Sequence, residues 1–254
     1  MSLSISNIAF DDLKYDDYIN YLLSIGINNI EIAPYKHFKT WNLNHINVDF
    51  FKKNNLNIVS TQGTFFNINI NLFKETQKFI EHFKKIIDIN KKLNCKYTVF
   101  GSPTVRKLDE HENKEEKYIF FNNIFNLFSN EEIDIGIELN PKIYNCNFFC
   151  QIEEIKYLNF SKNIYFHFDT GCLKASGASI NKEYENYKHI IKNIHVSEPG
   201  LNNLLNNTID HKEFANILTS NNFNGNISLE MKYENFETFK KSVDKFINIY
   251  KEFL

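Results

Sequence analysis

The amino-acid sequence predicts an α/β protein that folds as a single (β/α)8 TIM barrel, and three observations lead to this prediction. The chain has 254 residues, close to the roughly 250 that are typical of one such barrel. Eight short runs of strand character begin 26 to 40 residues apart, and a strand–helix–strand unit needs about 30 residues or more. The segments between the runs repeat apolar residues at helical spacing. Strands that alternate regularly with helices favour a closed parallel sheet.

The strand-like runs are short and end near turn-forming or polar residues. They are Leu3–Ala9, Asn29–Ala33, Asn57–Gln62, Tyr97–Gly101, Asp134–Leu139, Asn163–Asp169, Ile190–Val196 and Asn226–Met231. In a parallel barrel, the loops that follow the carboxyl ends of the strands form one face, and active sites of this fold lie on that face. Polar side chains at the ends of these runs are therefore the first candidates for function.

Apolar stripes mark the helices between the runs. One stripe is formed by Phe79, Ile80, Phe83, Ile86 and Ile87, and the last one by Phe236, Phe239, Val243, Phe246 and Tyr250. Steps of three and four residues place such side chains on one helix face. We expect both faces to pack on the outside of the sheet.

A doubly wound open sheet is the main rival fold. Such a sheet commonly follows its first strand with a glycine-rich phosphate-binding loop, and Ala9-Phe10-Asp11-Asp12 contains no glycine. No linker, low-complexity tract or internal repeat divides the chain, and the charged segment Lys107–Lys117 is typical of an exposed loop and helix start. We therefore expect residues 1–254 to form one TIM-barrel domain.

The charge balance argues against a polyanionic partner. The formal net charge is −2, without the basic stripe that nucleic acids or anionic membranes require. No run of 18 apolar residues and no secretory leader pattern is present. The spacing of Cys146 and Cys150 is not that of a zinc ribbon or a thioredoxin site. We expect a cytoplasmic protein that binds neither nucleic acid nor membrane. A homodimer is possible.

Each of the last four strand-like runs carries a side chain that can bind a metal near its end: Glu138, Asp169, His195 and Glu230. Neighbouring strands lie about 4.8 Å apart, so these four groups converge on a small volume. Three carboxylates gathered there repel one another, and a divalent cation would change their formal charge from about −3 to −1. Carboxylate and imidazole ligands suit one divalent ion, namely Mn²⁺, Co²⁺, Mg²⁺ or Zn²⁺.

A structural explanation exists for each residue taken alone. An acid at a strand end is commonly a helix cap, and a lone histidine is more often a hydrogen-bonded core residue than a ligand. The joint occurrence on four consecutive strands is what favours a metal site.

The order Glu, Asp, His, Glu on these strands resembles the xylose-isomerase-like TIM-barrel superfamily of sugar (phosphate) isomerases and epimerases, over most of the chain. The segment from His195 to Glu198 is similar to the His-x-Gly-Glu segment of ketose 3-epimerases. The other motifs that carry the resemblance are Gly26–Ile32, Ser60–Gln62, Gly101–Pro103, Glu138–Pro141, Asp169–Gly171 and Leu229–Met231. Each motif is weak by itself, whereas their order and spacing form a specific set.

The resemblance implies a metal-dependent isomerase or epimerase of a sugar or sugar derivative, phosphorylated or not, which works through a metal-stabilised enediolate. It implies that Glu138 and Glu230 are catalytic as well as ligands, one removing and one returning a proton at carbon. A sugar or inositol-type dehydratase on the same metal site is an alternative. A phosphodiesterase or endonuclease of the same superfamily and a non-catalytic sugar-binding barrel rank lower.

Two positions depart from the ketose 3-epimerase pattern: Cys172 stands where those enzymes usually have histidine, and Leu201 where they usually have a substrate-binding arginine. The candidates for substrate binding are Gln62, Ser102, Arg106, Asn140, Lys174, Glu198 and Lys232. Gln62 and Asn140 suit neutral hydroxyls, whereas the three cations suit phosphate or carboxylate.

Overall fold

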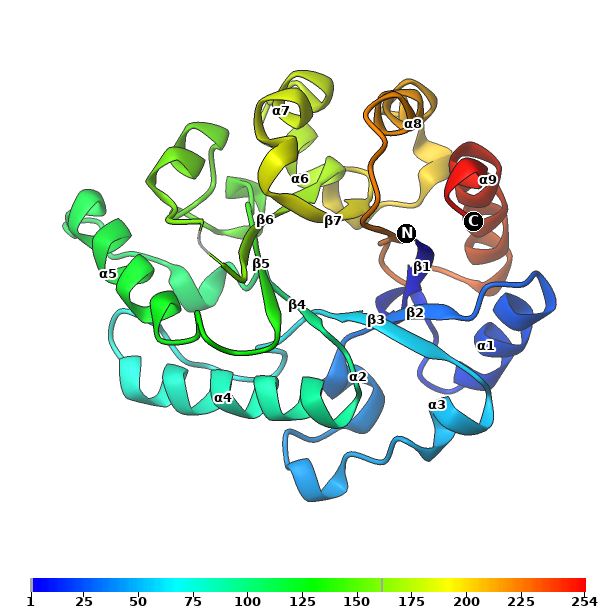
Figure 1. Cartoon of the computed structure of the whole chain (residues 1–254), viewed down its shortest axis with the longest axis horizontal. Helices are drawn as coiled ribbons and strands as arrows, with labels where there is room; N and C mark the ends of the chain where they lie inside the picture. Colours follow the sequence, from blue (N-terminus) through cyan, green and yellow to red (C-terminus); the bar gives the residue numbers. More distant parts are fainter. Residues whose placement is uncertain (1, 161) are drawn as a thin grey trace.

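A computed structural model of the chain describes residues 2–160 and 162–254. Eight parallel strands close into a barrel in the order of the sequence, with the last strand paired to the first (Figure 1). The strands are β1 Ser2–Ser6, β2 Asn29–Ile32, β3 Asn57–Thr61, β4 Tyr97–Phe100, β5 Asp134–Glu138, β6 Ile164–Asp169, β7 Ile191–Val196 and β8 Asn226–Leu229. The predicted (β/α)8 TIM barrel is confirmed.

Each of the eight predicted runs coincides with a strand, and the first run extends three residues beyond the end of its strand. β1 ends at Ser6, because Asn7–Ala9 turn into a short 3₁₀ segment. The Ser6 hydroxyl caps this segment by accepting a hydrogen bond from the Ile8 N–H. The side-chain oxygen of Asn7 then accepts the Ala33 N–H at 2.7 Å, which ties the first loop to the end of β2.

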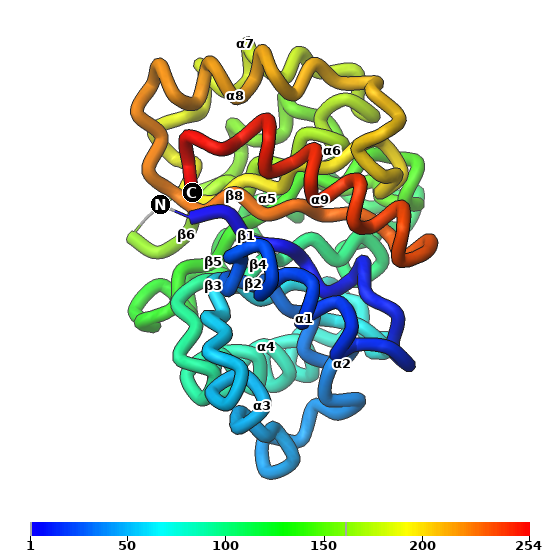
Figure 2. Tube along the Cα trace, turned by 90° about the vertical axis from the view of Figure 1, so that its right-hand side faces the viewer, coloured from blue at the N-terminus to red at the C-terminus, as the bar shows by residue number. Residues whose placement is uncertain are grey.

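Helices surround the barrel, and Figure 2 shows it from the side, with α7 and α8 above the strands and α3 and α4 below. Their bounds are α1 Tyr15–Ser24, α2 Pro34–Phe38, α3 Asp49–Lys53, α4 Thr76–Lys92, α5 Lys114–Asn126, α6 Thr170–Ala175, α7 Ile180–Tyr187, α8 His211–Ser220 and α9 Phe236–Tyr250. The described residues between β5 and β6 form 3₁₀ turns instead of an α-helix. None of the helices in the described part of the chain has the length and apolarity needed to cross a bilayer.

Aromatic side chains fill the layer between the helices and the sheet. Phe79 and Phe83 of α4 pack edge-on against Phe100 of β4, with ring centroids 5.7 and 6.2 Å apart. Phe125 of α5 completes this cluster at 5.1 Å from Phe100. The α4 stripe predicted from the sequence is therefore buried against the sheet. Close packing of rings holds the strands, and hence the side chains at their ends, in fixed positions.

Strand register brings the four candidate ligands to one end of the barrel. Glu138 and Asp169 are the last residues of β5 and β6, and Asp169 pairs directly with His195 of β7. Glu230 follows β8 immediately, and its N–H donates to the Val196 carbonyl at 3.0 Å. All four lie at the carboxyl ends of their strands, where this fold carries its active sites.

Candidate metal centre

His195 lies at the centre of the cluster. Its Nδ1 atom is 3.3 Å from Oε1 of Glu138, 3.7 Å from Oδ2 of Asp169 and 3.2 Å from Oε2 of Glu230. One potential ligand atom from each of the four residues lies within 4.8 Å of all the others. The structure thus brings together the four side chains that the sequence placed at one site.

Asp169 uses one carboxylate oxygen for structure and leaves the other free. Oδ1 caps α6 by accepting the Cys172 N–H at 2.5 Å, and it also accepts the Ser197 hydroxyl at 2.8 Å. Burial alone would raise the pKa of Asp169, but His195 and, to a smaller extent, these two donors hold it below its usual value. Oδ2 is buried without a hydrogen-bond partner among the described residues. That oxygen faces His195 and is available as a ligand.

Glu138 is held in a similar way from the opposite side of the cluster. Its Oε2 accepts a hydrogen bond from Nδ2 of Asn140 at 2.8 Å, while Oε1 points to His195. Gly101, at the end of β4, lies so close that a Cβ there would overlap Oε2 of Glu138. Glycine at this position is what leaves room for the carboxylate.

Glu31 fixes the orientation of the His195 ring. The Nε2 atom of His195 lies 2.9 and 3.0 Å from the two carboxylate oxygens of Glu31. Glu31 is fully buried, and it also accepts the Ser60 hydroxyl at 2.6 Å and the Gln62 amide at 2.9 Å. With the Nε2 proton directed to Glu31, Nδ1 is the nitrogen that faces the cluster and presents a lone pair once it is deprotonated, as in metal-binding histidines whose second nitrogen is hydrogen-bonded to a carboxylate.

In the sequence, Glu31 lies within the Gly26–Ile32 motif that carries part of the family resemblance, but no role is predicted for it. The available signal was its position at the end of the second strand-like run, where its side chain shares the barrel interior with the four ligands. The sequence alone does not show that its partner is a histidine 164 residues away.

Crowded carboxylates change the proton affinity of the cluster. Burial raises the pKa of Glu230 to about 8, and the nearby charges of Asp169 and Glu138 act in the same direction. Burial lowers the pKa of His195, but Glu230 and Glu31 outweigh this effect and raise it well above its usual value. Without a cation, the cluster therefore retains protons near neutral pH to reduce its negative charge.

His167 lies below the cluster, in the barrel core, as its position two residues before Asp169 predicts. It is fully buried, and its Nδ1 lies 3.2 Å from the hydroxyl of Tyr97. Its Nε2 is 4.0 Å from Oε1 of Glu138 and has no hydrogen-bond partner among the described residues. His167 could also join Glu138 and His195 in a three-ligand set.

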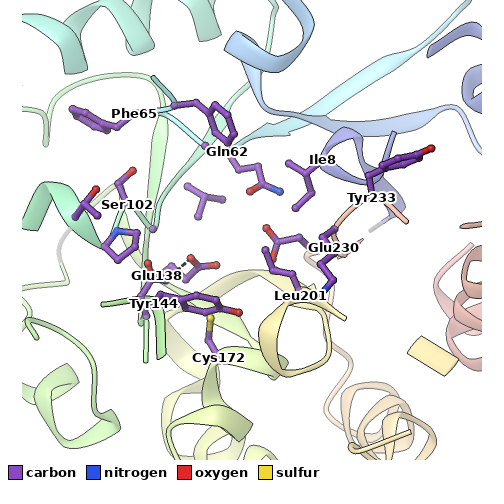
Figure 3. Close-up of a pocket in the computed structure, with 18 residues that line it drawn as sticks. Ile8, Gln62, Phe65, Ser102, Glu138, Tyr144, Cys172, Leu201, Glu230 and Tyr233 are labelled. Carbon is purple, nitrogen blue, oxygen red and sulfur yellow. Dashed lines mark hydrogen bonds between the residues drawn. The ribbon is translucent and has the colours of Figure 1, made fainter. Parts of the chain in front are cut away.

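A cavity of about 510 Å³ opens above the cluster, and Glu138 and Glu230 line its floor (Figure 3). Four of the seven side chains predicted to bind substrate also line it: Gln62, Ser102, Asn140 and Lys232. Gln62 and Asn140 each donate one hydrogen bond to a carboxylate of the site, Glu31 and Glu138 respectively.

The other three predicted substrate contacts do not line this cavity. Arg106 is fully buried, and its guanidinium donates to the main-chain oxygen of Glu138 at 2.7 Å. Lys174 is exposed beside a separate outer groove. Glu198 is buried 3.3 Å from Nε2 of His211, and its other oxygen accepts from Thr208. The contacts of Arg106 and Glu198 support the surrounding backbone and loops.

The donor set fits a divalent cation. Oδ2 of Asp169 and Nδ1 of His195 are buried without hydrogen-bond partners in the described part of the chain, although such atoms are normally paired. Both atoms face the two glutamate oxygens of the cluster. Mixed oxygen and imidazole ligands at this separation suit Mn²⁺, Co²⁺, Mg²⁺ or Zn²⁺.

Comparison with known proteins agrees with the fold. The model of the family described as xylose isomerase-like TIM barrel matches residues 20–249, whereas no curated protein sequence matches the chain. An AP endonuclease of family 2 from Brucella melitensis has 12% identity over 98% of this chain and 99% of its own, with a TM-score of 0.77.

Two further solved structures are similar. D-psicose 3-epimerase from Clostridium cellulolyticum H10 has 12% identity over 100% of this chain and 99% of its own, with a TM-score of 0.76. The IOLI protein, whose structure contains a zinc atom, has 16% identity over 100% and 99%, with a TM-score of 0.72. Identities this low show the shared fold alone.

We predict that Glu31→Gln lowers the affinity for Mn²⁺ by about 10- to 100-fold, the usual effect of losing the acceptor behind a histidine ligand. The side-chain amide of glutamine is uncharged, so it holds the Nε2 proton of His195 less strongly than the Glu31 carboxylate does. Isothermal titration calorimetry measures the affinity. Glu154→Gln removes a buried carboxylate outside the cluster and should leave the affinity unchanged. Equal affinities in wild type and Glu31→Gln, with both proteins folded, would contradict the positioning role.

We also predict that Mn²⁺ affinity rises with pH up to about pH 8. The raised pKa values of His195 and Glu230 mean that both groups carry protons near neutral pH in the metal-free protein. These protons must leave before the metal binds, so acid competes with the metal. Calorimetry in buffers of different ionisation enthalpy measures the protons released. Binding that releases no protons at pH 7 would exclude this coupling.

Proposed function

The chain belongs to the xylose isomerase-like TIM barrel family, and from this premise we propose that it is a divalent-metal-dependent isomerase or epimerase of a sugar or sugar derivative. One observation carries the proposal. Glu138 and Glu230 line the cavity from opposite sides (Figure 3), and next to them Oδ2 of Asp169 and Nδ1 of His195 have no hydrogen-bond partner among the described residues. We further propose that residues 1–254 act as one domain on a small-molecule substrate.

Glu138, Asp169, His195 and Glu230 would hold the metal. A bound divalent cation supplies Lewis-acid polarisation of a substrate carbonyl, which acidifies the neighbouring C–H bond. The zinc atom in the structure of the IOLI protein, which has a similar fold, supports a metal-binding function. In this chain, the Glu31 contact keeps the His195 lone pair directed toward the cation, and the Asn140 contact keeps one Glu138 oxygen in place.

The two glutamates are positioned to move a proton at carbon. Glu138 ends β5 and Glu230 follows β8, and these two strands flank β6 and β7, so the carboxylates reach the cavity from opposite sides. A substrate lying between them has one carboxylate on each face of its reacting carbon. One glutamate removes the proton, and the other returns it to the opposite face, which inverts the carbon. The similarity in fold to D-psicose 3-epimerase supports this chemistry.

Asp169 and His195 have a different assignment. Asp169 is tied by the Cys172 N–H and the Ser197 hydroxyl, and His195 is tied by Glu31. Neither side chain lines the cavity, so neither can reach a substrate carbon. We assign both to metal binding alone. Gln62 and Ser102 line the cavity and suit hydrogen bonds to substrate hydroxyls.

We predict that Glu138→Gln and Glu230→Gln each slow proton exchange at carbon by about 10²- to 10⁴-fold, because glutamine keeps an oxygen ligand but is not a base. The assay incubates the protein with ketoses and aldoses in D₂O at saturating Mn²⁺ and follows deuterium at carbon by mass spectrometry. The position of the label identifies the reacting carbon, and loss of water instead identifies a dehydratase.

Glu154→Gln serves as the control for this assay, because Glu154 is a buried carboxylate that pairs with Tyr118 and Lys114 outside the cluster. Metal content is measured in every variant. Near-normal exchange in both cluster variants, with metal fully bound, would overturn the two-glutamate mechanism.

A further inference from the structure

The walls of the cavity differ in chemistry from its floor. Carboxylates of Glu138 and Glu230 form the floor, whereas apolar and aromatic side chains dominate the walls. The wall residues that matter here are Ile8, Phe65, Phe66, Tyr144, Leu201 and Tyr233. Gln62, Ser102, Asn140 and Lys232 supply polar contacts in the same lining, so the cavity offers both polar groups for a sugar and apolar surface for another group.

Two aromatic side chains that line the cavity are exposed. Phe66 is 56% exposed and Tyr233 is 44% exposed. The main-chain oxygen of Phe66 accepts a hydrogen bond from the indole of Trp41 at 3.0 Å, and the Tyr233 hydroxyl donates to Asp11 at 3.1 Å. Exposed aromatic surface beside a cavity is typical of a site that binds an apolar group.

Leu201 contributes to the same wall from a strained backbone. Its φ of 56° is in the left-handed region, which is unfavourable for leucine, and it follows Gly200 at φ 76°. The Lys232 N–H donates to the Leu201 carbonyl at 2.8 Å and helps to hold this conformation. Backbone strain of this kind is concentrated at ligand sites, and here it directs an apolar side chain to the wall beside Glu230 (Figure 3).

The charges around the cavity do not favour a phosphate group. Among its described lining residues, Lys232 supplies the cation, while Glu138 and Glu230 supply negative charge. Phosphate recognition commonly uses several cationic or N–H donors, often a bidentate arginine. The Arg106 guanidinium is committed to the Glu138 main chain, and Lys174 lies at the outer groove.

We propose that the substrate is a non-phosphorylated keto sugar with an apolar or aromatic substituent, such as an alkyl or aryl group joined through an ether or glycosidic oxygen. This inference rests on the proposed function. The carbonyl and its neighbouring C–H lie over the two glutamates, and the substituent packs against Phe66, Tyr233 and Leu201.

Binding of unreactive probes tests the substituent site without any catalytic turnover. Phenyl β-D-glucoside, glucose and glucose 6-phosphate are titrated into the Mn²⁺-loaded protein by calorimetry. Burial of the phenyl ring should make the phenyl glucoside bind at least about tenfold more tightly than glucose. Glucose 6-phosphate should bind no more tightly than glucose. Equal binding of phenyl glucoside and glucose, or tighter binding of the phosphate than of the phenyl glucoside, would overturn the inference.

Variants locate the bound ring. Phe66→Ala and Tyr233→Ala should each weaken phenyl glucoside binding by about 2- to 10-fold and leave glucose binding unchanged. Tyr233→Phe keeps the ring and should bind normally. Ile119→Ala removes an exposed side chain of α5 that is not part of the cavity lining and serves as the control. If neither alanine variant affects binding, the aromatic site is excluded. If the wild-type protein showed no deuterium exchange, only the proposed function would be overturned, because probe binding does not require proton transfer.

Discussion

Four carboxylates, those of Glu31, Glu138, Asp169 and Glu230, surround the His195 ring inside the barrel mouth, and their mutual repulsion constrains the whole site. A buried carboxylate is expensive unless it is paired or hydrogen-bonded. Glu31 and Asp169 meet this requirement with hydroxyl and N–H donors from neighbouring segments. Glu230 meets this requirement least, and burial therefore raises its pKa to about 8. The charge that the protein leaves uncompensated is what a divalent cation would neutralise.

Small residues at the strand ends make this crowding sterically feasible. Gly101 leaves space for the Glu138 carboxylate, and a Cβ at Gly171 would overlap the Ser197 hydroxyl and approach the Glu198 carbonyl at 2.7 Å. The Gly171 N–H instead donates to the Ser197 oxygen at 3.0 Å. Close approach of the loops after β6 and β7 therefore positions the hydroxyl that holds Asp169. Backbone contacts that only glycine permits thus support the charged side chains.

Much of the fold and the central quartet could be predicted from the sequence, because both follow from periodicity. Strand spacing predicts the barrel, and a strand end in a barrel predicts where Glu138 or Asp169 lies. Side-chain direction in the loops has no such period. Arg106 belongs to a 3₁₀ turn that directs it inward to a main-chain oxygen, whereas Lys174 is on the exposed side of the short helix α6. Neither outcome follows from residue type or spacing.

The packed core and the cavity end of the barrel differ in how well their groups are stabilised. Packed rings such as Phe79, Phe83 and Phe100 stabilise the barrel wall far from the carboxylates, and burial of this kind contributes most of a domain's favourable free energy. The cavity end carries the opposite features: Oδ2 of Asp169 and Nδ1 of His195, which are buried without hydrogen-bond partners in the described part of the chain, and the left-handed backbone of Leu201. Such features persist only when the surrounding structure determines them. A cation that binds the folded chain would lower their cost by mass action, so metal occupancy and the stability of this end of the barrel should be coupled.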